Sequence, residues 1–256
     1  MARKDEYYNK AKQQGYRARS AYKLQQLDET ANLLDRGASV VDLGAAPGGW
    51  LQVAAEEVGP EGTVVGVDLQ RIKSLDADNV ETIRGDMTEA ETKEKLLEIV
   101  GEDGADVVLS DMAPNMTGEY SLDHARSVYL ARQAFEVAMD VLDAGGDFAV
   151  KVFDGQDLQD LKADIEPEFQ YVREVRPEAS RKQSSELYLV AKGRITAPVG
   201  VGDELDVEIT DVGNEGDGIA RVEGFTLFVA GAEEGETVRV RVTDVKPKFG
   251  FAERID

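Results

Sequence analysis

The sequence predicts an α/β protein with a seven-stranded, mostly parallel sheet, followed by a small all-β barrel. Two observations support this fold class. Between residues 39 and 193, short runs rich in β-branched residues alternate with stretches that place apolar residues every three or four positions, as in βαβ units. After about residue 195 the helical spacing ends, and short alternating runs follow one another at the spacing of a small barrel.

Seven strands are predicted in the first region because each run of Val, Ile, Leu or Phe is bounded by polar residues or glycine. They span residues 39–43, 63–69, 80–85, 105–112, 147–153, 171–177 and 185–193. Helices are predicted at residues 8–15, 19–34, 48–58, 89–100, 122–142 and 155–165. Residues 178–185, which join the last two strands, are too few for a helical crossover, so we expect an antiparallel strand at one end of the sheet.

The change in composition near residue 195 indicates a domain boundary. We expect one domain at residues 1–195 and a second at residues 196–256. The second contains alternating runs at residues 203–213, 218–224, 225–231, 236–246 and 250–255. Roughly 60 residues suffice for a five-stranded barrel but for little else.

The composition limits the chemistry that the chain can perform. No apolar run is long enough to span a bilayer, and the start of the chain lacks the apolar segment of a signal peptide, so we expect a cytoplasmic protein. The absence of cysteine and the presence of a single histidine, His124, exclude thiolate zinc sites, cysteine nucleophiles and histidine-rich metal sites. We therefore expect no metal, and chemistry that comes from carboxylates, lysines and backbone groups.

The charge is strongly acidic but unevenly distributed. A formal net charge of −22 argues against a nucleic-acid partner, except in a proteome adapted to molar salt, where the Debye length falls to about 3 Å. Residues 1–27 run against this trend, with seven Lys or Arg against two Asp or Glu. This segment is either an ordinary solvated basic helix or an arm that binds a polyanion.

The string VVDLGAAPGGW, at residues 40–50, is the most specific motif. A strand that ends with an acidic residue, followed by a glycine-rich turn and a helix, is typical of a nucleotide site at the carboxyl edge of an α/β sheet. The glycine spacing differs from G-x-G-x-x-G, so it fits a nicotinamide oxidoreductase poorly. Asp68, after the second strand, could accept the hydroxyls of a ribose, and Asp86, after the third, lies where an adenine is expected. Alternatively, each Asp only caps a turn.

Lys151 stands out in the string GDFAVKVFDG, at residues 146–155, because it interrupts an apolar strand. Burying an ammonium group costs several kcal/mol unless other groups compensate for it. Lys151 is therefore either a residue at the sheet edge whose amine reaches water, or a functional amine held in a polar cluster.

Five blocks together resemble one family. RSAYKLQQ (19–26), VVDLGAAPGGW (40–50), LSDMAPN (109–115), KVFDG (151–155) and SSELYLVAKG (184–193) are similar to those of FtsJ-type, S-adenosylmethionine-dependent RNA 2′-O-methyltransferases, most closely those that modify large-subunit ribosomal RNA. The resemblance covers residues 15–193. It implies a Rossmann-like methyltransferase fold, S-adenosyl-L-methionine as cofactor, and a uridine of 23S ribosomal RNA, free or in the large ribosomal subunit, as substrate.

The resemblance also implies roles for individual residues. The cofactor-binding residues would be Gly48, Trp50, Asp68, Asp86 and Asp111. The catalytic residues would be Lys23, Asp111, Lys151 and Glu186. Two departures are Asp154, where the family usually has a polar amide, and Leu51, where a small hydroxyl residue is common.

These residue types suit methyl transfer to a ribose hydroxyl, which mainly requires alignment of the hydroxyl and removal of its proton. We expect burial, with Lys23 as a second ammonium nearby, to favour the neutral amine of Lys151, which would accept the proton. Asp111 and Glu186 would hold the lysines and the hydroxyl in line. A carboxylate at Asp154 would oppose this by favouring the charged amine.

Residues 197–256 resemble the TRAM domain, a small barrel attached to several RNA-modifying enzymes, which implies RNA binding. Four aromatic residues could stack on bases: Phe225, Phe228, Phe249 and Phe251. Alternatively, they form the core of the barrel. The basic residues Lys246, Lys248 and Arg254 lie near two of them in sequence.

Two other functions stay open at this point. The catalytic residues would contact only a ribose, so methylation of a tRNA is an alternative within the same chemistry. A non-catalytic RNA-binding factor for ribosome assembly is an alternative from another class, although such a factor would not need all four polar residues.

Overall fold

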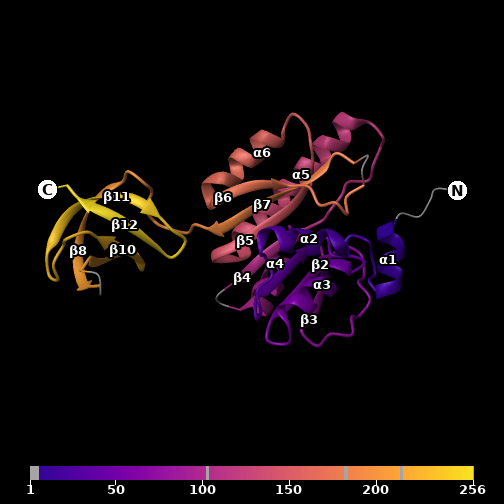
Figure 1. Cartoon of the computed structure of the whole chain (residues 1–256), viewed down its shortest axis with the longest axis horizontal. Helices are drawn as coiled ribbons and strands as arrows, with labels where there is room; N and C mark the ends of the chain where they lie inside the picture. The colour runs from indigo at the N-terminus through magenta and orange to yellow at the C-terminus, as the bar shows by residue number, and fades with distance from the viewer. Residues whose placement is uncertain (1–5, 102–103, 182–183, 214–215, 256) are drawn as a thin grey trace. The chain divides into compact units, whose positions relative to one another are not determined.

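The computed structural model describes residues 6–101, 104–181, 184–213 and 216–255 (Figure 1). The chain divides into two compact units. The first comprises residues 1–167 and 171–192, and the second comprises residues 168–170 and 193–256.

The first unit is built around a seven-stranded sheet, counted over the described residues, with the order β3-β2-β1-β4-β5-β7-β6. In that order the strands are Val80–Arg84, Thr63–Asp68, Ser39–Leu43, Ala105–Ser110, Leu142–Phe153, Glu186–Arg194 and Phe169–Val175. Strands β3, β2, β1, β4 and β5 are parallel, and β7 is antiparallel to β5. The predicted fold class, a mostly parallel Rossmann-like sheet with helices, is confirmed.

The antiparallel strand lies one position further inside the sheet than expected. β7 pairs with β5, and β6 forms the edge. The burial of the two strands explains this order. Residues 187–191 of β7 are all buried, whereas much of β6 is exposed, so β7 requires neighbours on both sides.

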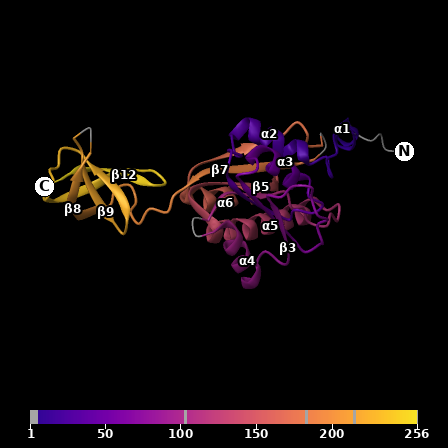
Figure 2. The ribbon, with the colours of Figure 1, turned by 90° about the horizontal axis from the view of Figure 1, so that it is seen from below.

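Helices cover both faces of this sheet. They are α1 (Glu6–Gln14), α2 (Ala21–Ala31), α3 (Gly49–Val58), α4 (Ala90–Val100), α5 (Tyr120–Val141) and α6 (Leu158–Ile165), with a 3₁₀ turn at Glu166–Glu168. In Figure 2, α2 and α3 lie on one side of the sheet, and α4 and α5 lie on the other. Among the described helices, none is both long and apolar enough to cross a membrane.

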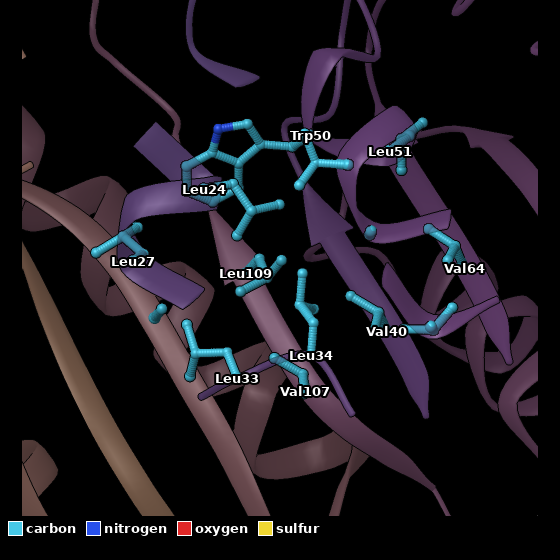
Figure 3. Packing of buried hydrophobic residues seen from close by; sticks show 14 of the residues in the cluster. Leu24, Leu27, Leu33, Leu34, Val40, Trp50, Leu51, Val64, Val107 and Leu109 are labelled. Atoms are coloured by element: carbon cyan, nitrogen blue, oxygen red, sulfur yellow. The ribbon is translucent and has the colours of Figure 1, made fainter. Parts of the chain in front are cut away.

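The face under α2 and α3 contains a continuous apolar core (Figure 3). Leu24 of α2, Trp50 of α3 and Leu109 of β4 are part of it. Ala149 of β5 also belongs to this core, so alternation along the strand places Lys151 on the same face. The next residue at this spacing, Phe153, completes the row. Lys151 is therefore a polar position between two apolar residues of the same row, near the carboxyl end of β5.

The second unit is a closed barrel with the strand order β10-β12-β11-β8-β9. The strands, in chain order from β8 to β12, are Glu204–Val212, Gly218–Val222, Phe225–Val229, Thr237–Val245 and Phe249–Arg254. Alternate side chains of these strands, such as Val238, Val240 and Val242 of β11, fill the core. The parallel pairing of β10 with β12 completes the ring.

Gly66 of β2 tests the packing of α3 on the sheet. A Cβ atom at this position would lie 2.7 Å from Cδ1 of Leu51 and 3.0 Å from Cβ of Ala45. We expect Gly66→Ala to lower the free energy of unfolding by about 1–3 kcal/mol through overpacking. Urea unfolding followed by the fluorescence of Trp50, the only tryptophan, reports this unit alone.

The matched background is Leu51→Ala, which removes the crowded side chain. In this background the cost of Gly66→Ala should fall by at least half. An unchanged cost would show that the two side chains do not compete for this space.

Candidate active site

Three strand ends bring the predicted catalytic residues together. Asp111 directly follows β4, and Lys151 lies near the end of β5. Because β7 is antiparallel to β5, its first residue, Glu186, lies opposite Phe153 at the same edge of the sheet. Lys23 comes from the first turn of α2, which packs over this edge. All four predicted catalytic residues therefore belong to one cluster.

The carboxylate of Asp111 is the centre of this cluster. Nζ of Lys151 lies 2.8 Å from Oδ1 of Asp111 and also donates to its backbone carbonyl. Nζ of Lys23 lies 3.4 Å from the same Oδ1 and 2.8 Å from Oε1 of Glu186. The side chains of Lys151 and Lys23 are only 7% and 9% exposed. Lys151 is thus a buried, paired amine, and its amine does not extend to water.

Tyr188 is a member of this cluster that the sequence analysis missed. Its hydroxyl donates a 2.6 Å hydrogen bond to Oδ1 of Asp111, and its ring is fully buried. Tyr188 is the direct cross-strand neighbour of Lys151. The signal was present in SELYLVAKG, because Glu186 and Tyr188 are two residues apart and must share a face of the strand.

The two carboxylates of the cluster are ionised. Burial acts to raise the pKa of Asp111, but the ammonium groups of Lys151 and Lys23 outweigh it and lower this pKa below the usual value. At Glu186 burial is likewise outweighed, mainly by Lys23, and the pKa is lowered. Burial and the neighbouring Asp111 raise the pKa of Tyr188 well above that of a free phenol, so its hydroxyl remains a donor. The amine of Lys151 is thus aligned by fixed acceptors, the side chain and the backbone carbonyl of Asp111.

The glycine-rich loop forms a second part of the site, at the end of β1. Gly44 has a φ of +79°, and a Cβ atom there would lie 2.1 Å from Cγ of Met112, next to Asp111. Gly48, with a φ of +102°, precedes α3, and a Cβ atom there would lie 3.0 Å from Nη1 of Arg17. Both positions need glycine. The loop therefore lies directly against the segment that carries Asp111, and it leads into the helix N-terminus, where backbone N–H groups lack helical partners.

Arg17 holds this loop from the N-terminal side. Its guanidinium donates to the carbonyls of Pro47, Lys73 and Ser74. Arg19 similarly donates to the carbonyl of Ala179. With Lys23, three of the seven basic residues in the predicted arm are thus bonded to the protein itself.

The carboxylates of the aspartates at the end of β2 and after β3 already accept some hydrogen bonds from the protein. Asp68 accepts hydrogen bonds from the amides of Ala46, at 2.9 Å, and Gln70, at 2.7 Å. Asp86 accepts from the amide and the hydroxyl of Thr88, which lower its pKa. The bonds from Gln70 and Thr88 are the turn-capping bonds of the alternative hypothesis, whereas the bond from Ala46 joins Asp68 to the glycine-rich loop. Each carboxylate has about four acceptor sites, so capping leaves room for a ligand hydroxyl.

Trp50 occupies a different place from the other predicted cofactor residues. Its indole ring is buried in the core against Tyr188, with ring centroids 5.8 Å apart, and its Nε1 donates to the carbonyl of Ser20 at 2.8 Å. The side chain therefore joins α3 to α2. Its backbone amide lies in the first turn of α3.

Asp42, in the strand before the loop, is a buried carboxyl with an unpaired oxygen. It is 2% exposed, and its Oδ2 has no hydrogen-bond partner. Burial, followed by the charges of Asp111 and Asp68, raises its pKa well above the usual value. The glycine loop and the strand-end carboxylates at this edge of the sheet fit a ligand with ribose hydroxyls.

Asp154 and His124 lie outside the cluster. The carboxylate of Asp154 pairs with Arg176 at 2.7 Å and not with Lys151. His124 lies 2.9 Å from the carbonyl of Phe153 through Nδ1, and its Nε2 accepts from the amide of Asp157. Over the described parts of the chain, no group of three or more His, Cys, Asp or Glu side chains could hold a metal ion.

Asp42→Asn provides a pH-dependent test of the buried acid. An acid whose pKa is raised on folding binds more protons in the folded state, so stability falls as the pH rises above the unfolded value of about 3.9 and levels off above the folded value. Relative to the wild type, Asp42→Asn should therefore gain stability between about pH 5 and pH 8. Urea unfolding at both pH values, followed by Trp50 fluorescence, measures this difference. A stability difference that is independent of pH would contradict it.

Comparison with known proteins agrees with this geometry. The FtsJ-like methyltransferase family matches residues 16–194, and the TRAM domain matches residues 198–255. Relatives named ribosomal RNA large subunit methyltransferase E include those of Haloarcula marismortui and Halorubrum lacusprofundi, both 68% identical over 100% of this chain and over 100% and 95% of theirs. The protein of that name from Methanosarcina mazei is 50% identical over 98% of this chain and 92% of its own.

A solved structure supports the same grouping. The crystal structure of a ribosomal RNA methyltransferase from Plasmodium falciparum matches 70% of this chain and 98% of its own, with a TM-score of 0.62 and 29% identity. The relatives from Haloarcula and Halorubrum belong to halophilic archaea, which agrees with the acidic composition. The chain belongs to the FtsJ-like methyltransferase family and carries a C-terminal TRAM domain.

Proposed function

We propose that this protein methylates the ribose 2′-hydroxyl of a uridine in the 23S RNA of the large ribosomal subunit, with S-adenosyl-L-methionine as donor. The observation that carries the proposal is the buried Lys151–Asp111 pair beside the glycine-rich loop. This pair supports the proposal because it sets an aligned amine next to the loop to which we assign the cofactor. The full-length similarity to proteins named as methyltransferases of large-subunit RNA supports the choice of RNA.

Residues at the ends of β1 to β4 would hold the cofactor. We assign Gly48, Asp68, Asp86 and Asp111 to this role, with Trp50 contributing its backbone amide while its indole stays in the core. When bound, S-adenosylmethionine supplies a methyl group already activated by a sulfonium. The protein therefore has to position the acceptor and to take up one proton.

Lys151 would accept that proton as a neutral amine, after it has given up the proton that it carries in the ion pair with Asp111. The bound donor would supply the methyl group to the ribose oxygen and leave as the neutral thioether, and the hydroxyl proton would move to Nζ of Lys151. Asp111 fixes this nitrogen through its side chain and its carbonyl, and Tyr188 fixes Asp111. Lys23 and Glu186 complete the cluster as a pair, so the positive charge formed on Lys151 is compensated.

Two regions would contribute contacts to RNA. In the N-terminal helices, Lys10 lies 4.6 Å from the centroid of the Tyr22 ring, and Lys12 is exposed in the last turn of α1. In the barrel, Phe225 is part of the core, whereas the rings of Phe228, Phe249 and Phe251 contact one another outside that core. Phe249 and Phe251 are 37% and 39% exposed, which leaves surface on which bases could stack. Molar salt would screen the repulsion between RNA and the acidic remainder of the chain. Because ribosomal RNA would be the substrate, we place this activity in the cytoplasm.

Lys151→Ala tests the assigned base. We expect the single-turnover rate of methyl transfer to fall by about 10²-fold or more, because proton removal loses its acceptor. The affinity for S-adenosylmethionine, measured by equilibrium dialysis, should change little. Lys151→Arg, which keeps the positive charge but cannot accept the proton, should be as slow as Lys151→Ala. Near-wild-type rates in either variant would contradict this role.

The choice of substrate is tested by tritium transfer from labelled S-adenosylmethionine, in molar and in low salt. Large-subunit RNA, assembled large subunits and tRNA serve as acceptors, and the modified nucleotide is then mapped. We expect a 2′-O-methyluridine in large-subunit RNA, and activity that survives molar salt. Modification of tRNA alone would support the tRNA alternative, and the absence of transfer to any RNA would overturn the proposal.

A further inference from the structure

A cavity of about 210 Å³ lies near the carboxyl ends of β4 and β5, outside the residues assigned to catalysis or to the cofactor. Its walls come from three segments: the loop after β4, the start of α5, and the residues that precede β7. The lining residues are Met116, Gly118, Tyr120, Asp123, Phe153, Ser184 and Ser185.

The position of the cavity relative to Lys151 can be worked out from the pairing and the order of the strands. Phe153 is two residues beyond Lys151 on β5, so both side chains belong to the same face. Phe153 is also the cross-strand partner of Glu186, whose amide donates to the hydroxyl of Ser184. The sheet order places β5 and β7 on one side of β4, and the strands that carry Asp68 and Asp86 on the other. The cavity is therefore on the β5–β7 side of β4, two residues along β5 from Lys151, whereas Asp68 and Asp86 are on the β2–β3 side.

The walls of the cavity are held in place before any ligand arrives. Asp123 accepts hydrogen bonds from the amide and the hydroxyl of Thr117 and from the amide of Gly118, which fixes the loop after β4. The hydroxyl of Tyr120 donates to the carbonyl of Asp154, which ties the start of α5 to the segment after β5. The side chain of Tyr120 is nevertheless 61% exposed. Its polar atom is engaged, and much of its surface remains available for stacking.

We propose that this cavity receives the base of the acceptor nucleotide, a single-ring pyrimidine, which stacks on Tyr120 while its ribose faces Lys151. The proposal rests on the proposed function, because it supplies the acceptor side of the same reaction. Pockets that enclose whole drug-sized ligands usually have about 300–1,000 Å³, so this smaller cavity fits one base and not a longer stretch of RNA.

The chemistry of the lining suits a neutral base. The carboxylate of Asp123 is engaged by the loop, while the hydroxyls of Ser184 and Ser185 can rotate to donate or to accept. A pyrimidine edge carries both kinds of group. Proteins that act on a nucleotide commonly turn its base out of the stack and hold it against an aromatic side chain, which here would leave the ribose at the sheet edge beside the amine.

Two tyrosines of the same helix provide a matched test. Tyr120 and Tyr129 both belong to α5 and are both 61% exposed, but only Tyr120 lines the cavity. We expect Tyr120→Ala to raise the KM for the RNA acceptor by about 10-fold or more. Tyr120→Phe, which keeps the ring, should stay within about 3-fold of the wild type. Tyr129→Ala should resemble the wild type, and the affinity for S-adenosylmethionine should be unchanged in all three variants.

A second measurement addresses the size of the base. In a short RNA that carries the mapped target, replacing the uridine with a purine should lower kcat/KM for the wild type by at least about 10-fold. The same replacement should cause a smaller loss of kcat/KM in Tyr120→Ala. Equal KM values for Tyr120→Ala and Tyr129→Ala, with both variants folded by the Trp50 unfolding assay, would overturn the base site while leaving the methyltransferase assignment intact. Absence of transfer to RNA by the wild type would overturn both.

Discussion

The shared carboxylate of Asp111 is the interaction on which the site depends. One oxygen, Oδ1, accepts from Lys151 and Tyr188 and lies 3.4 Å from Nζ of Lys23. These partners come from β5, β7 and α2, so the carboxylate joins three elements at the end of a fourth. Two buried amines without such a partner would cost several kcal/mol each. The same contacts that allow the lysines to be buried also aim their nitrogen atoms, and stability and alignment therefore have one physical cause.

The sheet topology makes this arrangement possible. A parallel strand after β5 would bring its carboxyl end to the site, whereas antiparallel β7 brings its first residues, Glu186 and Tyr188, to the same edge. The cluster then separates two regions with different chemistry. On the β1–β3 side are the glycine loop and strand-end aspartates, and on the β5–β7 side is a small cavity with an exposed tyrosine. A donor and an acceptor assigned to these two sides would meet at Lys151.

Much of the fold follows from local patterns, and the rest depends on contacts distant in sequence. The bounds of β1 were predicted without error, and Lys151 could be singled out because a lysine in an apolar run needs compensation. The place of β7 could not be predicted, since the burial of both its faces appears only once β6 is set beside it. Likewise, Arg17 looks like a free cation in the sequence, but it is bonded to the carbonyls of residues 30 to 57 positions away. Trp50 matched a motif, yet its indole serves the core because α2 offers it an acceptor at Ser20.

The most direct measurement of the central claim is a double-mutant cycle on single-turnover methyl transfer, with Lys23→Ala, Lys151→Ala and the two together. If Asp111 makes the amines one catalytic unit, the losses are strongly non-additive. Introduced into the wild type, Lys23→Ala should then lower the single-turnover rate by at least about 10-fold. Introduced into Lys151→Ala, it should lower that rate by less than about 3-fold. Fully multiplicative losses would contradict the account, because they would mean that the two lysines act independently.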